Sequence, residues 1–309
     1  MFGSRKAAVR KAFIVTGPTS GIGRATALAL ARYGTVVLVG RDPKRLEEVQ
    51  RRVTQRRRQA VSVVCDLADI ASVRRAAAEI IALDLPIAGL LNNAGIRQTR
   101  PAKNGQGWDM TFATNYLGPF ALTEALMPHL PDGANVVFVA SAVENPERQP
   151  AKAAGFRGGR FISVEASVRS EWQPGGSRNP GFDDYATSKQ CVLAAALALA
   201  RETPRLRINA VEPGVIINTG LGRDAPAFAR FLANYVIPVL VPLFMPFLSF
   251  LSTTRKAGRV ISRILLNPSG QTGVYFNESG RPMKGSPLVH DPKFQDRVVA
   301  ETRAFLAQV

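Results

Sequence analysis

The chain has 309 residues, 46% of them hydrophobic, and a formal net charge of +17 at pH 7. This length and apolar content are enough for one large folded core. Its two cysteines, Cys65 and Cys191, exclude a disulfide framework and favour a reducing, cytoplasmic compartment. Its two histidines show no metal-ligand spacing, so we predict no metal site. The basic N-terminus lacks the apolar core of a secretion signal.

Positive charge is most concentrated in residues 41–59, RDPKRLEEVQRRVTQRRRQ. Segments of this kind attract nucleic acid or anionic membranes, or they form the solvated face of a helix. No zinc finger, helix-turn-helix pattern or ribbon of alternating aromatic and basic residues accompanies the charge. We therefore expect a solvated helix and no nucleic-acid partner.

Short apolar runs alternate with segments of helical spacing along the first two thirds of the chain. The predicted strands are 12–17, 35–41, 60–67, 87–95, 134–142 and 206–214. The predicted helices are 23–34, a basic helix within 41–59, 70–82, 108–130 and the segment that carries Tyr185. Continuous apolar strands between helices predict an α/β fold with a doubly wound parallel sheet, the Rossmann fold, as a single domain over 1–309. Its ligand crevice would lie at the carboxyl ends of the strands.

Two strand ends carry signals for a dinucleotide. After the first strand, TGPTSGIG (16–23) places three glycines where a pyrophosphate would meet a helix N-terminus. After the second strand, NAD-binding proteins commonly have an acid, but this chain has Gly40 and then Arg41. A guanidinium favours a 2′-phosphate, and Asp42 is too far round the turn to replace the missing acid, so the sequence predicts NADP(H).

Tyr185 and Lys189 are four positions apart in DDYATSKQCV (183–192) and would share one face of a helix. A lysine ammonium beside a phenol favours the phenolate. Bringing the tyrosine pKa from about 10 to neutrality needs roughly 4 kcal/mol, which requires a partly dry site. The spacing also occurs by chance, so the interpretation depends on the rest of the sequence.

The chain resembles the short-chain dehydrogenase/reductase family over about residues 10–220, with protochlorophyllide oxidoreductase-like and retinol dehydrogenase-like members closest in pattern. The matching motifs, in order, are TGxxxGIG at 16–23, Asp-Leu at 66–67, NNAG at 92–95, Asn115 in TNYLG, a strand-end Ser141, Tyr185 with Lys189, and Pro-Gly at 213–214. The resemblance implies an NADP-dependent oxidoreductase whose catalytic set is Asn115, Ser141, Tyr185 and Lys189.

In this family Tyr185 would exchange a proton with the substrate oxygen, and Lys189 would lower its pKa and hold the nicotinamide ribose. Ser141 would hydrogen-bond the substrate oxygen, and Asn115 would anchor a water leading to Lys189. The alternatives are that Ser141 only caps a strand end and that Asn115 only satisfies helix backbone groups. The implied cofactor-binding residues are Gly17, Thr19, Ser20, Gly21, Ile22, Gly23, Arg41, Asp66, Leu67, Asn93, Ala94, Gly95, Tyr185, Lys189, Pro213, Gly214 and Thr219, with Asn218 as an alternative to Thr219.

Ser141 and Tyr185 are 44 positions apart, whereas compact family members separate these residues by about a dozen. We interpret residues 144–182, rich in Gly, Pro and Arg, as an insertion over the cleft. Phe156, Phe161 and Trp172 are its expected anchors.

Residues 231–251 form an uncharged stretch of 21 residues, long enough to span a bilayer, but prolines at 238, 242 and 246 disfavour a straight helix. We expect an apolar lid over about 220–255, with peripheral membrane contact as the second interpretation and a true span as the third. A lid of this kind predicts a small but bulky hydrophobic substrate. Beyond it, Ser252 or Thr253 should cap a helix whose core-facing residues are Ala257, Val260, Ile261 and Ile264, and 273–276 should form the last edge strand.

The sequence therefore predicts hydride transfer between NADP(H) and a hydrophobic alcohol or carbonyl compound. The alternatives are reduction of a C=C bond in a conjugated or polycyclic substrate, and a catalytically silent NADP-binding scaffold. The family commonly forms homodimers and homotetramers, so either assembly is expected unless a membrane-facing lid favours a monomer. The expected location is cytoplasmic, with membrane association as the alternative.

Overall fold

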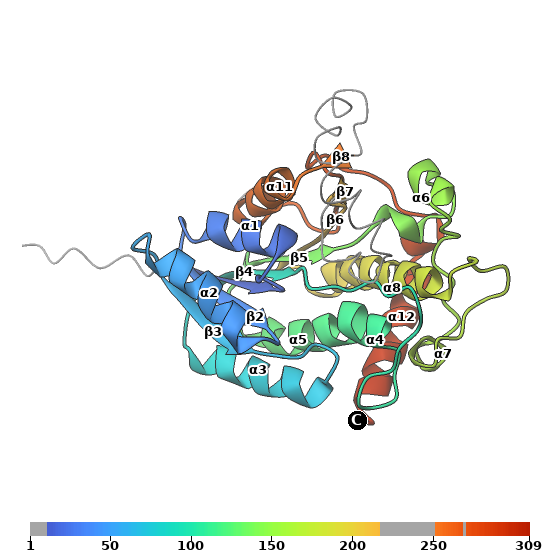
Figure 1. Cartoon of the computed structure of the whole chain (residues 1–309), viewed down its shortest axis with the longest axis horizontal. Helices are drawn as coiled ribbons and strands as arrows, with labels where there is room; N and C mark the ends of the chain where they lie inside the picture. Colours follow the sequence, from blue (N-terminus) through green and yellow to red (C-terminus); the bar gives the residue numbers. More distant parts are fainter. Residues whose placement is uncertain (1–10, 217–250, 268–269) are drawn as a thin grey trace, which may run out of the picture.

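The computed structural model describes residues 11–216, 251–267 and 270–309. A wholly parallel sheet of seven strands runs through its centre (Figure 1). Across the sheet the strands are β3 (Ala60–Val64), β2 (Thr35–Gly40), β1 (Ala12–Thr16), β4 (Ile87–Asn92), β5 (Asn135–Val139), β6 (Arg207–Val211) and β9 (Tyr275–Phe276). This order confirms the predicted doubly wound Rossmann-type sheet.

Helices cover both faces of the sheet (Figure 1). One face packs against α1 (Gly21–Leu30), α2 (Pro43–Thr54) and α11 (Thr254–Leu266). The other packs against α3 (Ile70–Ala82), α5 (Gly118–Leu126) and α8 (Pro180–Glu202), and α12 (Pro292–Leu306) packs on α8. Within β1, Phe13 and Val15 point to the face that carries α1, α2 and α11, and Ile14 points to the face that carries α3, α5 and α8. Burial on both faces explains why the strands are continuous apolar runs.

The predicted helix over 108–130 is wrong as one continuous α-helix. The segment consists of α4 (Met110–Phe112), a π-helix (Ala113–Leu117), α5 and a 3₁₀ turn (Met127–His129). Pro119 lacks the amide that would bond to the carbonyl of Asn115, and its ring crowds that carbonyl. The wider π turn accommodates the proline and places Asn115 in its centre.

Residues 144–182 fold against the N-terminal half of α8 and against α12. They contain α6 (Gln149–Ala153) and α7 (Val164–Val168), and a 3₁₀ turn (Ala142–Glu144) precedes them. Phe156 and Phe161 are buried and Trp172 is half-buried. The ring of Phe161 meets that of Phe294 on α12 edge-on, with centroids 5.8 Å apart.

The C-terminal part begins with β8 (Leu251–Ser252), which pairs with β7 (Val215–Ile216). Thr253 caps α11, as predicted, by accepting a hydrogen bond from the Lys256 amide at 3.1 Å. The four residues predicted to face the core are buried, and β9 is an edge strand. A 3₁₀ turn (Leu288–His290) leads into α12.

Thr219, Asn218 and nearly all of the predicted lid and the stretch 231–251 lie outside the described residues. Among the helices that are described, none combines the length and the hydropathy needed to cross a bilayer.

Candidate active site

Most of the predicted site residues follow the carboxyl ends of β1 to β6, which share one edge of the parallel sheet, while Asn115, Tyr185 and Lys189 lie on helices. Strands β1 to β3 follow one another toward one side of the sheet, and β4 to β6 toward the other side. Such folds bind ligands at the point between β1 and β4 where this order reverses. Thr16 joins the loops after these two strands, because its hydroxyl accepts hydrogen bonds from the amides of Asn93 at 2.9 Å and Ala94 at 3.0 Å. The Asn93 side chain donates in turn to the Thr16 carbonyl at 2.9 Å. These hydrogen bonds hold the two loops together.

The glycines of the first loop have different reasons for being glycine. Gly23 lies so close to the loop that a Cβ atom would stand 2.2 Å from the Gly17 carbonyl oxygen. Gly17 and Gly21 have positive φ values, 65° and 54°. A Cβ on Gly21 would meet no atom within 4 Å, so this side of the loop faces open space.

The N-terminus of α1 is suited to an anion. Its first residue follows Ser20, whose side chain forms no capping hydrogen bond. Elsewhere in the described ranges, side chains do cap the helices α2, α3, α8, α11 and α12. The leading amides of α1 therefore point toward the open space at Gly21 without a side-chain acceptor, which is the arrangement that holds a pyrophosphate. The loop fits a dinucleotide, and its residues Thr19, Ser20 and Ile22 are partly exposed.

At the end of β2, Arg41 is exposed. Asp42 uses its carboxylate to cap α2, accepting from the Arg45 amide at 3.2 Å, and its other oxygen lies 3.3 Å from Arg45 Nε. At the end of β3, Asp66 accepts a hydrogen bond from the Ala68 amide at 3.0 Å, and Leu67 is buried beside it. The position at β2 therefore offers a cation and no uncommitted carboxylate to a ribose.

Ser141 and Tyr185, far apart in sequence, meet in the structure. Ser141 follows β5 and Tyr185 lies in the second turn of α8, where it is 9% exposed. The Ser141 hydroxyl lies close enough to the phenol to favour the phenolate, as does the charge of Arg97. Burial and the nearby carboxylate of Glu212 act more strongly and raise the pKa of Tyr185 to about 12.

Lys189 is predicted to lower the pKa of Tyr185, while the charges that act on this pKa in the structure are those of Glu212 and Arg97. The Lys189 ammonium donates a hydrogen bond to the Val139 carbonyl at 2.7 Å and lies 5.7 Å from the centroid of the Tyr185 ring. Burial lowers the pKa of Lys189 to about 8, and Glu212 opposes this shift. Neighbouring positions on one helix face therefore do not suffice to acidify the phenol, because the lysine is directed toward the end of β5.

Asn115 links the π-helix to the loop after β4. Its Oδ1 accepts from the Ile96 amide at 2.8 Å, and its Nδ2 donates to the Ile96 carbonyl at 2.9 Å and to Ser188 Oγ at 3.1 Å. A Cβ on Gly95 would lie 3.3 Å from Asn115 Oδ1 and 3.7 Å from Lys189 Nζ. The side chain of Asn115 therefore binds the loop after β4 and α8, and not the backbone of its own helix.

Glu212, after β6, is a site residue that the sequence analysis missed. It is 8% exposed, and its carboxylate accepts from the amides of Ala142 and Gly214, the latter at 3.0 Å. Burial raises its pKa, and these hydrogen bonds and Lys189 oppose the rise. Glu212 therefore holds the predicted Pro213–Gly214 turn against the turn that carries Ser141. Its only sequence signal is an acid at the end of an apolar strand.

Comparisons with known proteins agree on one family. The family model described as short chain dehydrogenase matches residues 11–152. Retinol dehydrogenase 14 from Homo sapiens is 31% identical over 94% of this chain and 83% of its own length. Protochlorophyllide reductase B from Hordeum vulgare is 28% identical over 85% of this chain and 69% of its own. A crystal structure of an uncharacterized protein from Mycobacterium paratuberculosis superposes with a TM-score of 0.70 at 25% identity, covering 96% of this chain and 93% of that one.

Proposed function

Because the chain belongs to the short-chain dehydrogenase family, as an oxidoreductase with retinol dehydrogenase-like and protochlorophyllide reductase-like relatives, we propose that it moves a hydride between NADP(H) and a bulky apolar alcohol or carbonyl compound. Tyr185 is the proposed general acid and base. The observation that carries this proposal is that Ser141 and Tyr185, 44 positions apart in sequence, lie close enough for Ser141 to act on the pKa of the phenol, with Lys189 one turn further along α8. Two hydroxyl groups in this arrangement can bind one substrate oxygen together.

When bound, the nicotinamide ring would supply or accept the hydride. The residues that would hold the cofactor are the loop 16–23, which leads into the uncapped N-terminus of α1, together with Asp66 and the segment 93–95. The preference for NADP rests on Arg41 and Asp42. Arg41 is exposed at the end of β2, while the Asp42 carboxylate is already used by α2 and Arg45. A 2′-phosphate would pair with the guanidinium, whereas a free ribose diol would find no acceptor there.

Tyr185 holds the proton of the reaction on its phenolic oxygen. With a pKa of about 12 the phenol is protonated at neutral pH, which is the form that donates to a carbonyl oxygen. Ser141 and Arg97 stabilise the phenolate that remains after the donation. Asn115 would keep Lys189 and the loop after β4 in place, through its bonds to Ile96.

An apolar substrate is supported by the surroundings of the phenol. Phe156 and Phe182 stack with centroids 4.3 Å apart and planes 10° apart, and Phe156 also packs 6.3 Å from the Tyr185 ring. Val143 and Ala186 complete this small apolar cluster. The relative named retinol dehydrogenase carries an apolar alcohol in its name.

The second candidate reaction is reduction of a C=C bond, which the name of the protochlorophyllide reductase relative favours. An α,β-unsaturated aldehyde such as citral separates the two. Carbonyl reduction gives the allylic alcohol and C=C reduction gives the saturated aldehyde, and chromatography resolves the products. A silent scaffold would bind NADPH and form neither.

Tyr185→Phe tests the proposal, because it removes the hydroxyl and keeps the ring. Consumption of NADPH with apolar carbonyl compounds should fall at least about a hundredfold, while NADPH affinity stays unchanged. Tyr116→Phe is the matched control, since this tyrosine is also buried and its hydroxyl forms a 2.7 Å hydrogen bond with Thr302 on α12. Turnover retained by Tyr185→Phe would refute the assigned role.

A further inference from the structure

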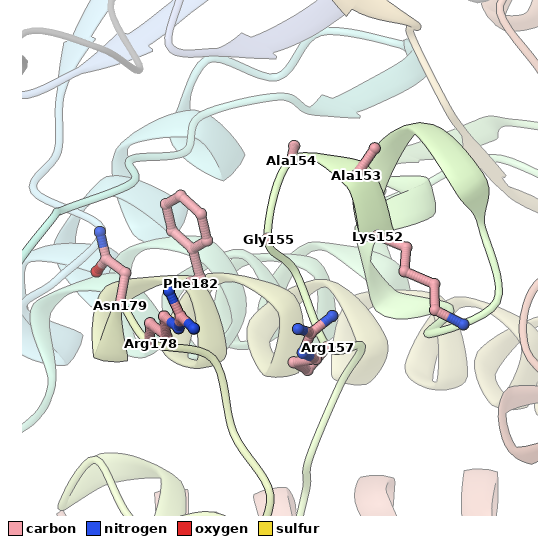
Figure 2. Close-up of a pocket in the computed structure, with 8 residues that line it drawn as sticks. All are labelled: Lys152, Ala153, Ala154, Gly155, Arg157, Arg178, Asn179 and Phe182. Carbon is pink, nitrogen blue, oxygen red and sulfur yellow. The ribbon is translucent and has the colours of Figure 1, made fainter.

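A surface pocket of about 380 Å³ lies at the start of α8, beside the predicted catalytic residues (Figure 2). It is formed by two parts of the segment before α8 and by the first turn of the helix. Its lining residues are Lys152, Ala153, Ala154, Gly155, Arg157, Arg178, Asn179 and Phe182. Figure 2 shows Phe182 rising from α8 between Asn179 and the loop at Gly155.

The pocket is strongly basic and holds no acid. Lys152 is paired with Glu147, which lies 3.6 Å away outside the pocket. Arg157 and Arg178 have neither an ion pair nor a side-chain hydrogen bond to any described residue. Arg157 and Arg178 are exposed, so water screens most of the repulsion between them, and a bound anion could pair with both guanidinium groups.

Other arginines of the same segment are different. Arg160 donates to the Gln173 carbonyl at 2.8 Å, and Arg169 forms two bonds to Glu171 at 2.9 and 3.0 Å. Of the arginines in this segment that have no ion pair or side-chain hydrogen bond to a described residue, Arg157 and Arg178 line the pocket and Arg148 does not. Asn179 adds a neutral donor, because its Oδ1 is used by the Gly181 amide while its Nδ2 has no partner within the described ranges.

The pocket is connected to Tyr185 by aromatic rings. Phe182 lines the pocket and precedes Tyr185 by one turn of α8. One neighbour of its ring is Phe156, which packs on Tyr185, and another is the guanidinium of Arg97, 5.5 Å from the ring centroid. The charge of Arg97 in turn acts on the Tyr185 phenol. An apolar chain that lies along these rings would join an anion in the pocket to a carbonyl at Tyr185.

We propose that this pocket binds a carboxylate or phosphate group of the substrate, whose apolar part extends past Phe182 to Tyr185. This inference rests on the proposed function for its second half only. The substrate class is then an apolar alcohol or carbonyl compound with an anionic group at the far end. Arginine suits both anions, because its planar donors bind two oxygens at once.

Binding is tested first without turnover, by calorimetric titration of the whole protein with monomeric decyl phosphate and with decanol. Arg157→Gln/Arg178→Gln should weaken decyl phosphate binding about tenfold or more and leave decanol unchanged. Arg52→Gln/Arg56→Gln is the control, since it removes the same charge from two exposed positions, one in the last turn of α2 and one just after this helix. Equal affinities of the wild type and the pocket variant for decyl phosphate would overturn the inference, whether or not the protein reduces any carbonyl.

Kinetics then assigns the anion to the substrate. Wild-type KM should be about tenfold lower for 10-oxodecanoate than for decanal, the pocket variant should lose this preference, and kcat should change little. Decyl phosphate should inhibit competitively. Equal KM values, or noncompetitive inhibition, would overturn the substrate assignment. So would arginine-dependent sedimentation with phosphatidylglycerol vesicles without any effect on KM, which would identify a lipid headgroup instead. Failure of the wild type to reduce either aldehyde would count against the proposed function, while the titration would still judge the pocket.

Discussion

Asp184→Asn should stabilise the folded protein at and above neutral pH, because it removes a carboxyl group that the fold keeps protonated. The Asp184 side chain precedes Tyr185 and is 2% exposed. Burial and the neighbouring Asp109 raise its pKa to about 8. Ser170 and Lys103 oppose this shift, but within the described residues neither oxygen of Asp184 has a hydrogen bond of good geometry.

The magnitude follows from the two pKa values. An unperturbed aspartate titrates near 3.8, so between this pH and about 8 the unfolded chain releases a proton that the folded chain keeps. Stability contributed by the protonated carboxyl is therefore full at low pH and is lost as pH rises through this window. At about 1.36 kcal/mol per pKa unit, the loss is of the order of 3–6 kcal/mol above pH 8. An asparagine of the same shape has no proton to lose.

The assay is chemical denaturation of both proteins at about pH 4, 6 and 8. The advantage of Asp184→Asn should be smallest at the lowest pH and should grow by roughly 1 kcal/mol per pH unit. Asp183→Asn is the control, because Asp183 accepts from the amide and hydroxyl of Ser177 at 2.8 and 3.0 Å. It should lose stability instead. A pH-independent difference, or an Asp184 variant less stable than the wild type at pH 8, would refute the reasoning.

Three further changes test the cofactor loop and the fold. Arg41→Glu should shift the ratio of NADPH to NADH affinity by about tenfold or more toward NADH in a fluorescence titration, and an unchanged ratio would contradict the assignment of the 2′-phosphate. Gly23→Ala should abolish dinucleotide binding, since its Cβ would lie 2.2 Å from the Gly17 carbonyl oxygen. Gly21→Ala should bind better, because its Cβ has open space and costs only backbone strain of about 1 kcal/mol. Equal losses of dinucleotide affinity in the two variants would count against the close approach of Gly23. Thr253→Ala should cost about 1 kcal/mol of stability and lower Tm, and an unchanged Tm would show that the cap contributes nothing.

The sheet was predictable because its strands are buried on both faces, which gives apolar runs that need no knowledge of tertiary contacts. The strand ends were placed up to three residues too far where apolar residues such as Cys65 and Leu67 continue into loops. The break at Asn115 was not predicted, although Pro119 signals it in retrospect. No element was predicted beyond residue 276, and α12, which closes the core beside α8, was missed.

The site was predictable as a set of strand ends but not as a set of contacts. Sequence order places Ser141 and Lys189 near one edge of the sheet, yet it does not say that residues 144–182 fold against α8 and α12 and leave Ser141 close to Tyr185. The direction of the Lys189 side chain on α8 depends on its hydrogen bond to a single carbonyl, that of Val139 at the end of β5. Glu212 was missed because an acid before a Pro-Gly turn is more typical of a solvated loop.

Burial, more than the lysine, sets the proton balance of the pair on α8. Burial favours the neutral form of each group: it is the main cause that raises the pKa of Tyr185 to about 12 and lowers that of Lys189 to about 8. The Glu212 carboxylate raises both pKa values, because it favours the ammonium and disfavours the phenolate. The consequence is a phenol that is protonated at neutral pH beside a lysine that is mostly charged. Ser141 and Arg97 are the groups that stabilise the phenolate, so the acidity of Tyr185 depends on them and not on its neighbour along α8.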